Sequence, residues 1–123
     1  MKKLISVMLI FACIAGCSQN DIGYISISAE QAKELMDKSE NYIILDVRTK
    51  EEFDEIRILN AMLIPDTEIA DRAEDELTDK DQLIFVYCRS GNRSKKASAI
   101  LAEMGYTNIK EFGGIKDWPY ETE

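Results

Sequence analysis

The 123-residue chain contains no histidine, only two prolines and one tryptophan, and more acidic than basic residues. Without histidine, a cysteine–histidine dyad and the usual histidine-based zinc sites are excluded. The formal net charge of −8 leaves no broad basic face to neutralise phosphates, so nucleic-acid binding is not expected. The main body also lacks internal repeats, low-complexity tracts and dividing linkers. One domain with one hydrophobic core is therefore predicted.

Long hydrophobic runs are absent as well. The apolar run at residues 4–15 has twelve residues, whereas a membrane-spanning helix needs about 20. Two lysines precede the run, and small residues followed by Cys17 and a polar stretch end it, which resembles a bacterial lipoprotein signal. The predicted organisation is a signal peptide at residues 1–16, a lipid-anchored linker at 17–23 and a folded domain at 24–123. An ordinary secretory peptide or a short uncleaved anchor is the alternative.

This organisation predicts a domain on the extracytoplasmic side of a bacterial membrane, in the cell envelope. Acyl chains on Cys17 would anchor it, each buried CH₂ group contributing about 0.8 kcal/mol. Removal of residues 1–16, which hold two lysines and no acids, would change the net charge from −8 to −10. Cys13 would leave with the signal, so Cys88 would be the only thiol of the mature domain. No internal disulfide is then possible, and a monomer is favoured.

Apolar runs alternate with amphipathic segments along the body. The expected strands are 24–27, 42–45, 61–64, 83–87 and 109–112, and the expected helices are 28–37, 50–56, 66–77 and 93–104. Ser28 with Gln31, and Thr49 with Glu52, have capping-box spacing at two helix starts. This alternation predicts an α/β fold with a mostly parallel sheet and helices on both faces, whose ligands bind at the carboxyl ends of the strands.

Cys88 follows the most apolar predicted strand, at such a carboxyl end, and a predicted helix begins a few residues later. A loop of this kind directs backbone N–H groups inward, where they and the helix dipole stabilise an anion such as a thiolate. Two arginines, Arg89 and Arg93, flank the loop and should help lower the thiol pKa from about 8.5. Cys88 is therefore predicted to be a nucleophile; its alternative is a small, inert, buried side chain.

Several landmarks in this order resemble a single-domain rhodanese. They are Asp46-Val47-Arg48, Glu52-Phe53, the segment 61–65, the loop from Cys88 to Arg93, and Gly113-Gly114 followed by Trp118. The resemblance covers nearly all of residues 24–120. It implies a rhodanese-like fold with a five-stranded sheet, and a cysteine that alternates between thiolate and persulfide. The implied activity is that of a sulfurtransferase.

The resemblance assigns the remaining roles. Its substrate-binding loop consists of Arg89, Ser90, Gly91, Asn92, Arg93 and Ser94. The arginines would attract a small anionic donor such as thiosulfate, Gly91 would let the loop bend, and a thiol or cyanide would accept the sulfur. No cofactor or metal is expected. Lys95 and Lys96 extend the cationic patch or form an ordinary exposed helix face.

The chain departs from the family at residues 56–61, where members commonly carry Gly-His-Ile-x-Gly-Ala. Asn60 can adopt the left-handed conformation in place of glycine. Arg57 either adds positive charge near the pocket or, as we expect, faces water. Asp46 and Arg48 are expected to be structural, with Arg48 pairing with Glu52. Phe112 and Trp118 are expected in the core.

Three alternative functions compete with sulfur transfer. A phosphatase or arsenate reductase uses a similar loop, but with five residues between cysteine and arginine, whereas four separate Cys88 from Arg93. The chain could also be a non-enzymatic sulfur carrier, or a binding module that docks on a partner at the membrane. Retention of Cys88 and Arg93 argues against an inactive module.

Overall fold

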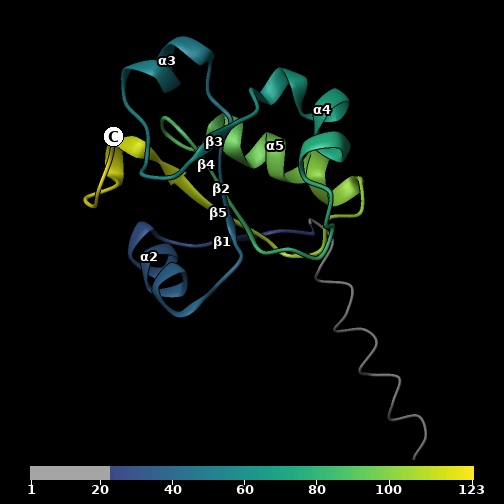
Figure 1. Ribbon diagram of the computed structural model, residues 1–123, viewed down its shortest axis with the longest axis horizontal. Coiled ribbons are helices and arrows are strands. Elements are labelled where there is room, and N and C mark those ends of the chain that lie inside the picture. Colours follow the sequence, from purple (N-terminus) through teal and green to yellow (C-terminus); the bar gives the residue numbers. More distant parts are fainter. Residues whose placement is uncertain (1–22) are drawn as a thin grey trace, which may run out of the picture.

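The computed structural model describes residues 23–123 and is built around one five-stranded sheet (Figure 1). The strands are β1 (Ile25–Ser26), β2 (Ile43–Asp46), β3 (Met62–Leu63), β4 (Ile84–Cys88) and β5 (Ile109–Gly114). Their order is β1-β5-β4-β2-β3, and every neighbouring pair is parallel. Strand β4 lies at the centre and all five of its residues are buried. The predicted α/β fold with a five-stranded sheet is confirmed.

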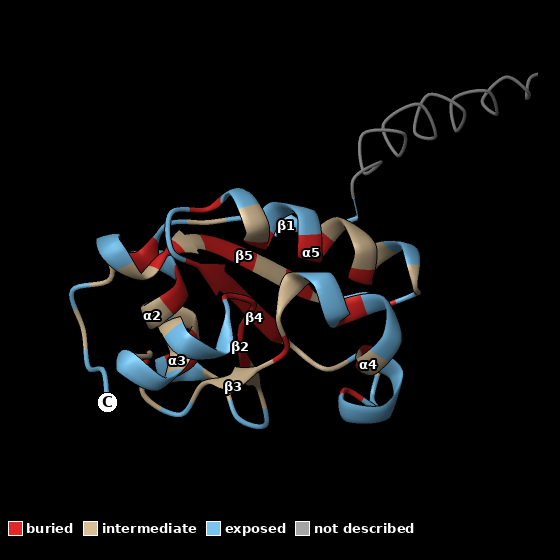
Figure 2. Ribbon diagram, turned by 90° about the horizontal axis from the view of Figure 1, so that it is seen from above, coloured by how far each residue is buried: buried red, intermediate tan, exposed pale blue. Residues whose placement is uncertain are grey.

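Helices cover both faces of the sheet, as predicted (Figures 1 and 2). They are α2 (Ala29–Lys38), α3 (Lys50–Glu55), α4 (Ile69–Glu76) and α5 (Asn92–Glu103), with 3-10 turns η2 (Asp66–Glu68) and η3 (Ile115–Asp117). Helix α2 packs on one face, and α4 and α5 on the other. The helix predicted at 66–77 is divided, because its first turn follows Pro65 as a 3-10 turn without a side-chain cap.

Local capping signals operate as the sequence predicts. Ser28 and Gln31 form a complete capping box at the start of α2, and Thr49 and Glu52 form another at α3. Asn60 adopts the predicted left-handed conformation, with φ of 70°. The departure from the family glycine at this turn is therefore accommodated by asparagine.

Two hydrophobic clusters divide the core between the faces of the sheet. Alternate residues of β4 supply each cluster, because successive side chains of a strand point to opposite faces. Val86 and Cys88 lie in the cluster beneath α4 and α5, while Phe85 and Tyr87 lie in the one beneath α2. Figure 2 shows the buried residues concentrated along the central strands. The thiol of Cys88 is therefore on the α5 side of the sheet.

The predicted signal peptide at residues 1–16 and the lipid site at Cys17 lie outside the described residues. Those assignments, and the domain boundaries drawn from them, stay predictions. Among the helices of residues 23–123, none has the length and apolar character required to cross a membrane.

Candidate active site

Cys88 ends β4, and the chain turns into α5 within four residues. Gly91 makes that turn possible with φ of 114°, a conformation that side-chain-bearing residues rarely adopt. The Gly91 backbone N–H donates to Cys88 Sγ at 3.0 Å. Backbone N–H groups of Ser90 and Ser94 also point at the sulfur. The loop therefore encloses Sγ in main-chain donors.

The Cys88 side chain is buried, with only 1% of the residue exposed. Burial raises the pKa of the Cys88 thiol, but the hydrogen bond between the thiol and the Ser94 hydroxyl and those from the backbone of Ser94, Gly91 and Ser90 outweigh it and lower the pKa below its ordinary value. An inert buried cysteine would be surrounded by apolar side chains, which would raise its pKa. The environment of Cys88 instead favours the thiolate.

A buried carboxylate lies behind the sulfur. The Ser94 hydroxyl is 3.5 Å from Cys88 Sγ and donates to Glu111 Oε2 at 2.6 Å. The Ser26 hydroxyl donates to Glu111 Oε1 at 2.7 Å, and the Gly113 N–H donates to Oε2 at 2.9 Å. These contacts form one polar cluster between β1, β5 and α5. The cluster is in the interior, because Glu111 is only 1% exposed.

Arg93 is held at the edge of the loop by Glu52 of α3. Its Nη1 and Nη2 donate to the two carboxylate oxygens at 2.8 and 3.1 Å. This contact, more than any other, lowers the pKa of Glu52 to about 2. The expected pairing of Arg48 with Glu52 is wrong, because Arg48 precedes the N-cap Thr49 and does not lie on the helix surface where i,i+4 pairs form.

Arg48 pairs instead with Asp46, and both are buried. Arg48 Nη2 contacts Asp46 Oδ2 at 2.7 Å and also donates to the Ile56 carbonyl at 2.6 Å. The Tyr87 hydroxyl donates to Asp46 Oδ2 at 2.6 Å and accepts from the Ile58 N–H. This network ties β2, β4 and the segment after α3 together, which agrees with the structural role expected for Asp46 and Arg48.

The side chains of Arg89, Ser90 and Asn92 make no hydrogen bond to the sulfur. Arg89, Ser90 and Asn92 are exposed at the surface, as are Lys95 and Lys96 in the first turn of α5. The predicted residues are therefore brought to one place, with the cations outside and the main-chain donors inside. Their individual roles stay predictions.

Gly114 is required where β5 passes the loop. A Cβ atom on Gly114 would collide with the Arg89 carbonyl and with Ser90 Cα. The bare backbone of the second glycine lets β5 support the underside of the cysteine loop.

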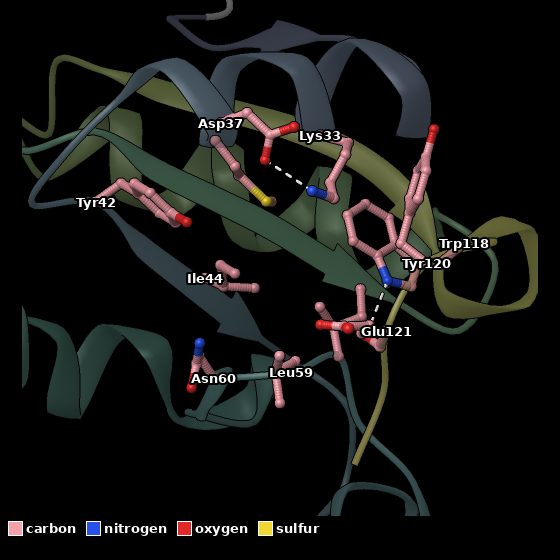
Figure 3. Close-up of a pocket in the computed structure, with 11 residues that line it drawn as sticks. Lys33, Asp37, Tyr42, Ile44, Leu59, Asn60, Trp118, Tyr120 and Glu121 are labelled. Carbon is pink, nitrogen blue, oxygen red and sulfur yellow. Dashed lines mark hydrogen bonds and ion pairs between the residues drawn. The ribbon is translucent and has the colours of Figure 1, made fainter.

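A separate small cavity of about 100 Å³ lies on the α2 side of the sheet (Figure 3). Trp118 and Tyr120 form one wall, and the Lys33–Asp37 ion pair spans the other. Trp118 also packs on Phe112, with ring centroids 5.3 Å apart, so both belong with the core as expected. The cavity does not include Cys88.

Arg57 is neither free in water nor at the cysteine loop. Its guanidinium lies 4.6 Å from the Phe53 ring centroid and 3.7 Å from Glu123. Backbone hydrogen bonds also join Arg57 to Glu123. The residue that replaces the family histidine thus fastens the C-terminal segment. No group of three or more potential metal ligands occurs within residues 23–123.

The structure is a parallel α/β sheet with a cysteine at the carboxyl end of its central strand, and backbone amides surround the sulfur. This arrangement defines the class: α/β proteins with a reactive cysteine in a strand-to-helix loop. The sequence fits one family within that class. The rhodanese-like domain model matches residues 28–120, and the chain belongs to the rhodanese-like domain family.

Known proteins agree with this assignment. The chain is 38% identical over 73 residues to the Escherichia coli protein named thiosulfate sulfurtransferase PspE, covering 59% of this chain and 70% of PspE. It is 36% identical over 107 residues to the Bacillus subtilis putative sulfur carrier protein YrkF, covering 86% of this chain but 57% of YrkF. A solved rhodanese with anions from E. coli superposes with a TM-score of 0.63 at 34% identity, covering 67% of this chain and 96% of that structure.

The sequence did not lead us to Glu111 or to the Glu52–Arg93 pair. A signal for Glu111 was present: it is two residues from Ile109 in a strand, so the two side chains share the buried face. An acid on a buried face needs partners. Those partners, Ser26 and Ser94, lie far away in sequence and carry no signal of their own.

Proposed function

We propose that the protein is a sulfurtransferase that moves a sulfane sulfur from thiosulfate or a persulfide donor to a thiol or cyanide acceptor. The observation that carries the proposal is the ring of donors around Cys88 Sγ, which lowers the thiol pKa. A thiolate in such a cradle can attack sulfur, and the same donors can stabilise the persulfide anion that results.

The reaction divides into two displacements. In the first, the Cys88 thiolate bonds to the outer sulfur of thiosulfate, the sulfur–sulfonate bond breaks, and sulfite leaves with the electron pair. In the second, cyanide or a thiolate bonds to the outer sulfur of the persulfide, and Cys88 leaves as thiolate. Charge balances in both steps without a proton transfer, which suits a site without histidine.

Arg93 and Arg89 supply the positive charge that a dianionic donor requires. Arg93 is oriented by Glu52, whereas Arg89 is exposed and can move to meet the donor. The resemblance to PspE supports thiosulfate as the donor, and the four residues between Cys88 and Arg93 favour sulfur over a phosphate-sized group.

The test is thiocyanate formation from thiosulfate and cyanide by the wild-type protein and by Cys88→Ser. We expect activity above background in the wild type and a fall to background in the variant, with unchanged circular dichroism. Equal activity in both would overturn the proposal. Hydrolysis of a phosphate ester that depends on Cys88 would favour the phosphatase alternative instead.

A sulfur carrier is the second candidate, because the match to the putative sulfur carrier protein YrkF covers most of this chain. A carrier would form the Cys88 persulfide but pass it only to one protein partner. Turnover with cyanide or small thiols would exclude this reading, whereas a stable persulfide that survives both would support it.

We further propose that lipid on Cys17 holds the domain at the outer side of a bacterial membrane. The lipoprotein-like residues before and after Cys17 support this location. The mass of the mature N-terminus tests it: a diacylated or triacylated Cys17 is expected. An N-terminus that begins elsewhere, or an unmodified Cys17, would contradict it.

A further inference from the structure

Glu111 is buried without a guanidinium partner. Its nearest cation is Lys95, whose Nζ lies 3.8 Å from Oε1 and whose side chain is 55% exposed. A carboxylate removed from water is stable only where neighbouring groups compensate for lost hydration. Glu111 obtains this compensation from the hydroxyls of Ser26 and Ser94 and from the Gly113 N–H.

One of these three donors can reverse its direction. The Ser94 hydroxyl has one proton and can also accept, and it lies between Glu111 Oε2 and Cys88 Sγ. When Cys88 is a thiol, its S–H can donate to Ser94, and Ser94 donates to Glu111. When Cys88 is a thiolate, Ser94 can turn its proton toward the sulfur, provided that Glu111 donates to Ser94.

We propose that Cys88 and Glu111 share one proton through the Ser94 hydroxyl, so that Glu111 takes up the proton that the thiol releases. The S–H bond breaks as that proton bonds to Ser94 Oγ, and the Ser94 O–H bond breaks as its proton bonds to Glu111 Oε2. Serine is neutral before and after. The single negative charge moves from the carboxylate to the sulfur, where the Gly91 N–H stabilises it.

The other charged groups around Cys88 and Glu111 do not compete with Glu111 as the acceptor of the thiol proton. Arg93 of α5 interacts electrostatically with Cys88, but its guanidinium is paired with Glu52 of α3 and also interacts with the charge of Asp66 of η2. Lys95 contacts the carboxylate from the exposed side. Within residues 23–123 no cationic side chain donates a hydrogen bond to Sγ, and the chain has no histidine. Glu111 is the base that a hydroxyl connects to the thiol.

This inference rests on the proposed sulfur transfer for its purpose. Cys88 and Glu111 together would carry one negative charge instead of two when a dianionic donor binds. That charge would already be on Cys88 Sγ, the atom that attacks the donor. Glu111 and Ser94 are therefore positioning residues that act through Cys88.

The test is the rate of iodoacetamide alkylation of Cys88 as a function of pH, followed by mass spectrometry on the peptide that contains Cys88. Two groups that interact by more than about one pK unit titrate in two steps. We expect two rises in the wild-type profile. Glu111→Gln should show a single rise between them, and Ser94→Ala, which keeps the carboxylate but removes the bridge, should lose the lower rise.

Glu103→Gln is the matched control, because it makes the same acid-to-amide change at an exposed residue of α5, the helix that carries Ser94, and should keep both rises. A single rise in the wild type, or two rises in Glu111→Gln, would overturn the proposal. Alkylation requires no sulfur donor, so these outcomes are independent of the thiosulfate assay. Two rises with no sulfur transfer would reject only the proposed function.

Discussion

Two carboxylates are buried near the carboxyl edge of the sheet, on opposite faces, and their surroundings differ. Asp46 is closed by the guanidinium of Arg48 and the hydroxyl of Tyr87, which fix its oxygens at 2.6–3.1 Å. Glu111 is closed by two hydroxyls and one amide, and one of those hydroxyls also contacts the thiol. The Asp46 carboxylate is neutralised by the permanently charged Arg48 guanidinium. The Glu111 network instead includes the Ser94 hydroxyl, whose proton can point toward either Glu111 or Cys88.

Asp46 is thus a buried acid with a structural use, and Glu111 is one with a chemical use. An Asp–Arg pair holds segments together but has no mobile proton at neutral pH, since arginine stays protonated. A Glu–Ser–Cys chain contains two groups that can exchange a proton through a third. Variants of the Asp46 network should therefore change stability, and variants around Cys88 should change reactivity.

Asp46→Ala is expected to have the largest effect on stability. It leaves the Arg48 guanidinium buried without its counter-charge, and breaking a buried pair from one side costs about 3–5 kcal/mol. Urea unfolding measures the loss. Asp54→Ala, which removes an exposed ion pair with Lys50, is the control and should cost less than about 1 kcal/mol. Equal losses would show that the Asp46 network is no more than a surface contact.

Gly114→Ala should reduce sulfur transfer by about 100-fold, because the new Cβ pushes the Arg89 and Ser90 backbone and displaces the donors around the sulfur. Gly105→Ala is the control. It strains the backbone, because Gly105 has φ of 101° whereas Gly114 has φ of −137°, but its Cβ would meet only the flexible Lys80 side chain. That control should lower stability and leave the transfer rate of the folded protein unchanged. If both variants keep the wild-type rate, the loop does not depend on β5.

The Glu52–Arg93 pair should give a smaller, pH-dependent effect. The pKa of Glu52 is about 2 in the folded protein and about 4.3 in an unfolded chain. Its stabilisation is therefore complete above the unfolded value and is lost as pH falls from there toward 2. Because both side chains are partly exposed, we expect about 1 kcal/mol.

Unfolding in urea at several pH values between the two pKa values measures this loss. Glu52→Gln keeps the capping geometry with Thr49 and should remove this part of the pH dependence. If the free energy of unfolding of Glu52→Gln falls with pH as it does in the wild type, the Glu52–Arg93 pair contributes nothing to stability.

The order of strands and helices along the chain was predictable because apolar runs alternate with amphipathic segments and because two helices begin with complete capping boxes. The Cys88 loop was predictable for the same reason, since a strand end, a glycine and a helix start are all local signals. Asn60 shows that even a departure from the family pattern could be interpreted locally.

The side-chain partners were less accessible. Arg48 and Glu52 are four residues apart, yet Arg48 lies before the helix and contacts Asp46. Glu52 is joined to Arg93 across 41 residues, and Ser26 to Glu111 across 85. Such pairs depend on which strands become neighbours and how segments cross the sheet edge, and the sequence predicted the kind of sheet without these contacts.

The central claim is that a sulfur anion on Cys88, held by main-chain donors, accepts one further sulfur atom. Intact-mass spectrometry of the wild-type protein after thiosulfate treatment tests it most directly. The account predicts a gain of one sulfur atom that localises to the Cys88 peptide, disappears on addition of cyanide and is absent from Cys88→Ser. A folded wild-type protein that gains no mass, or a variant that gains the same mass, would contradict it.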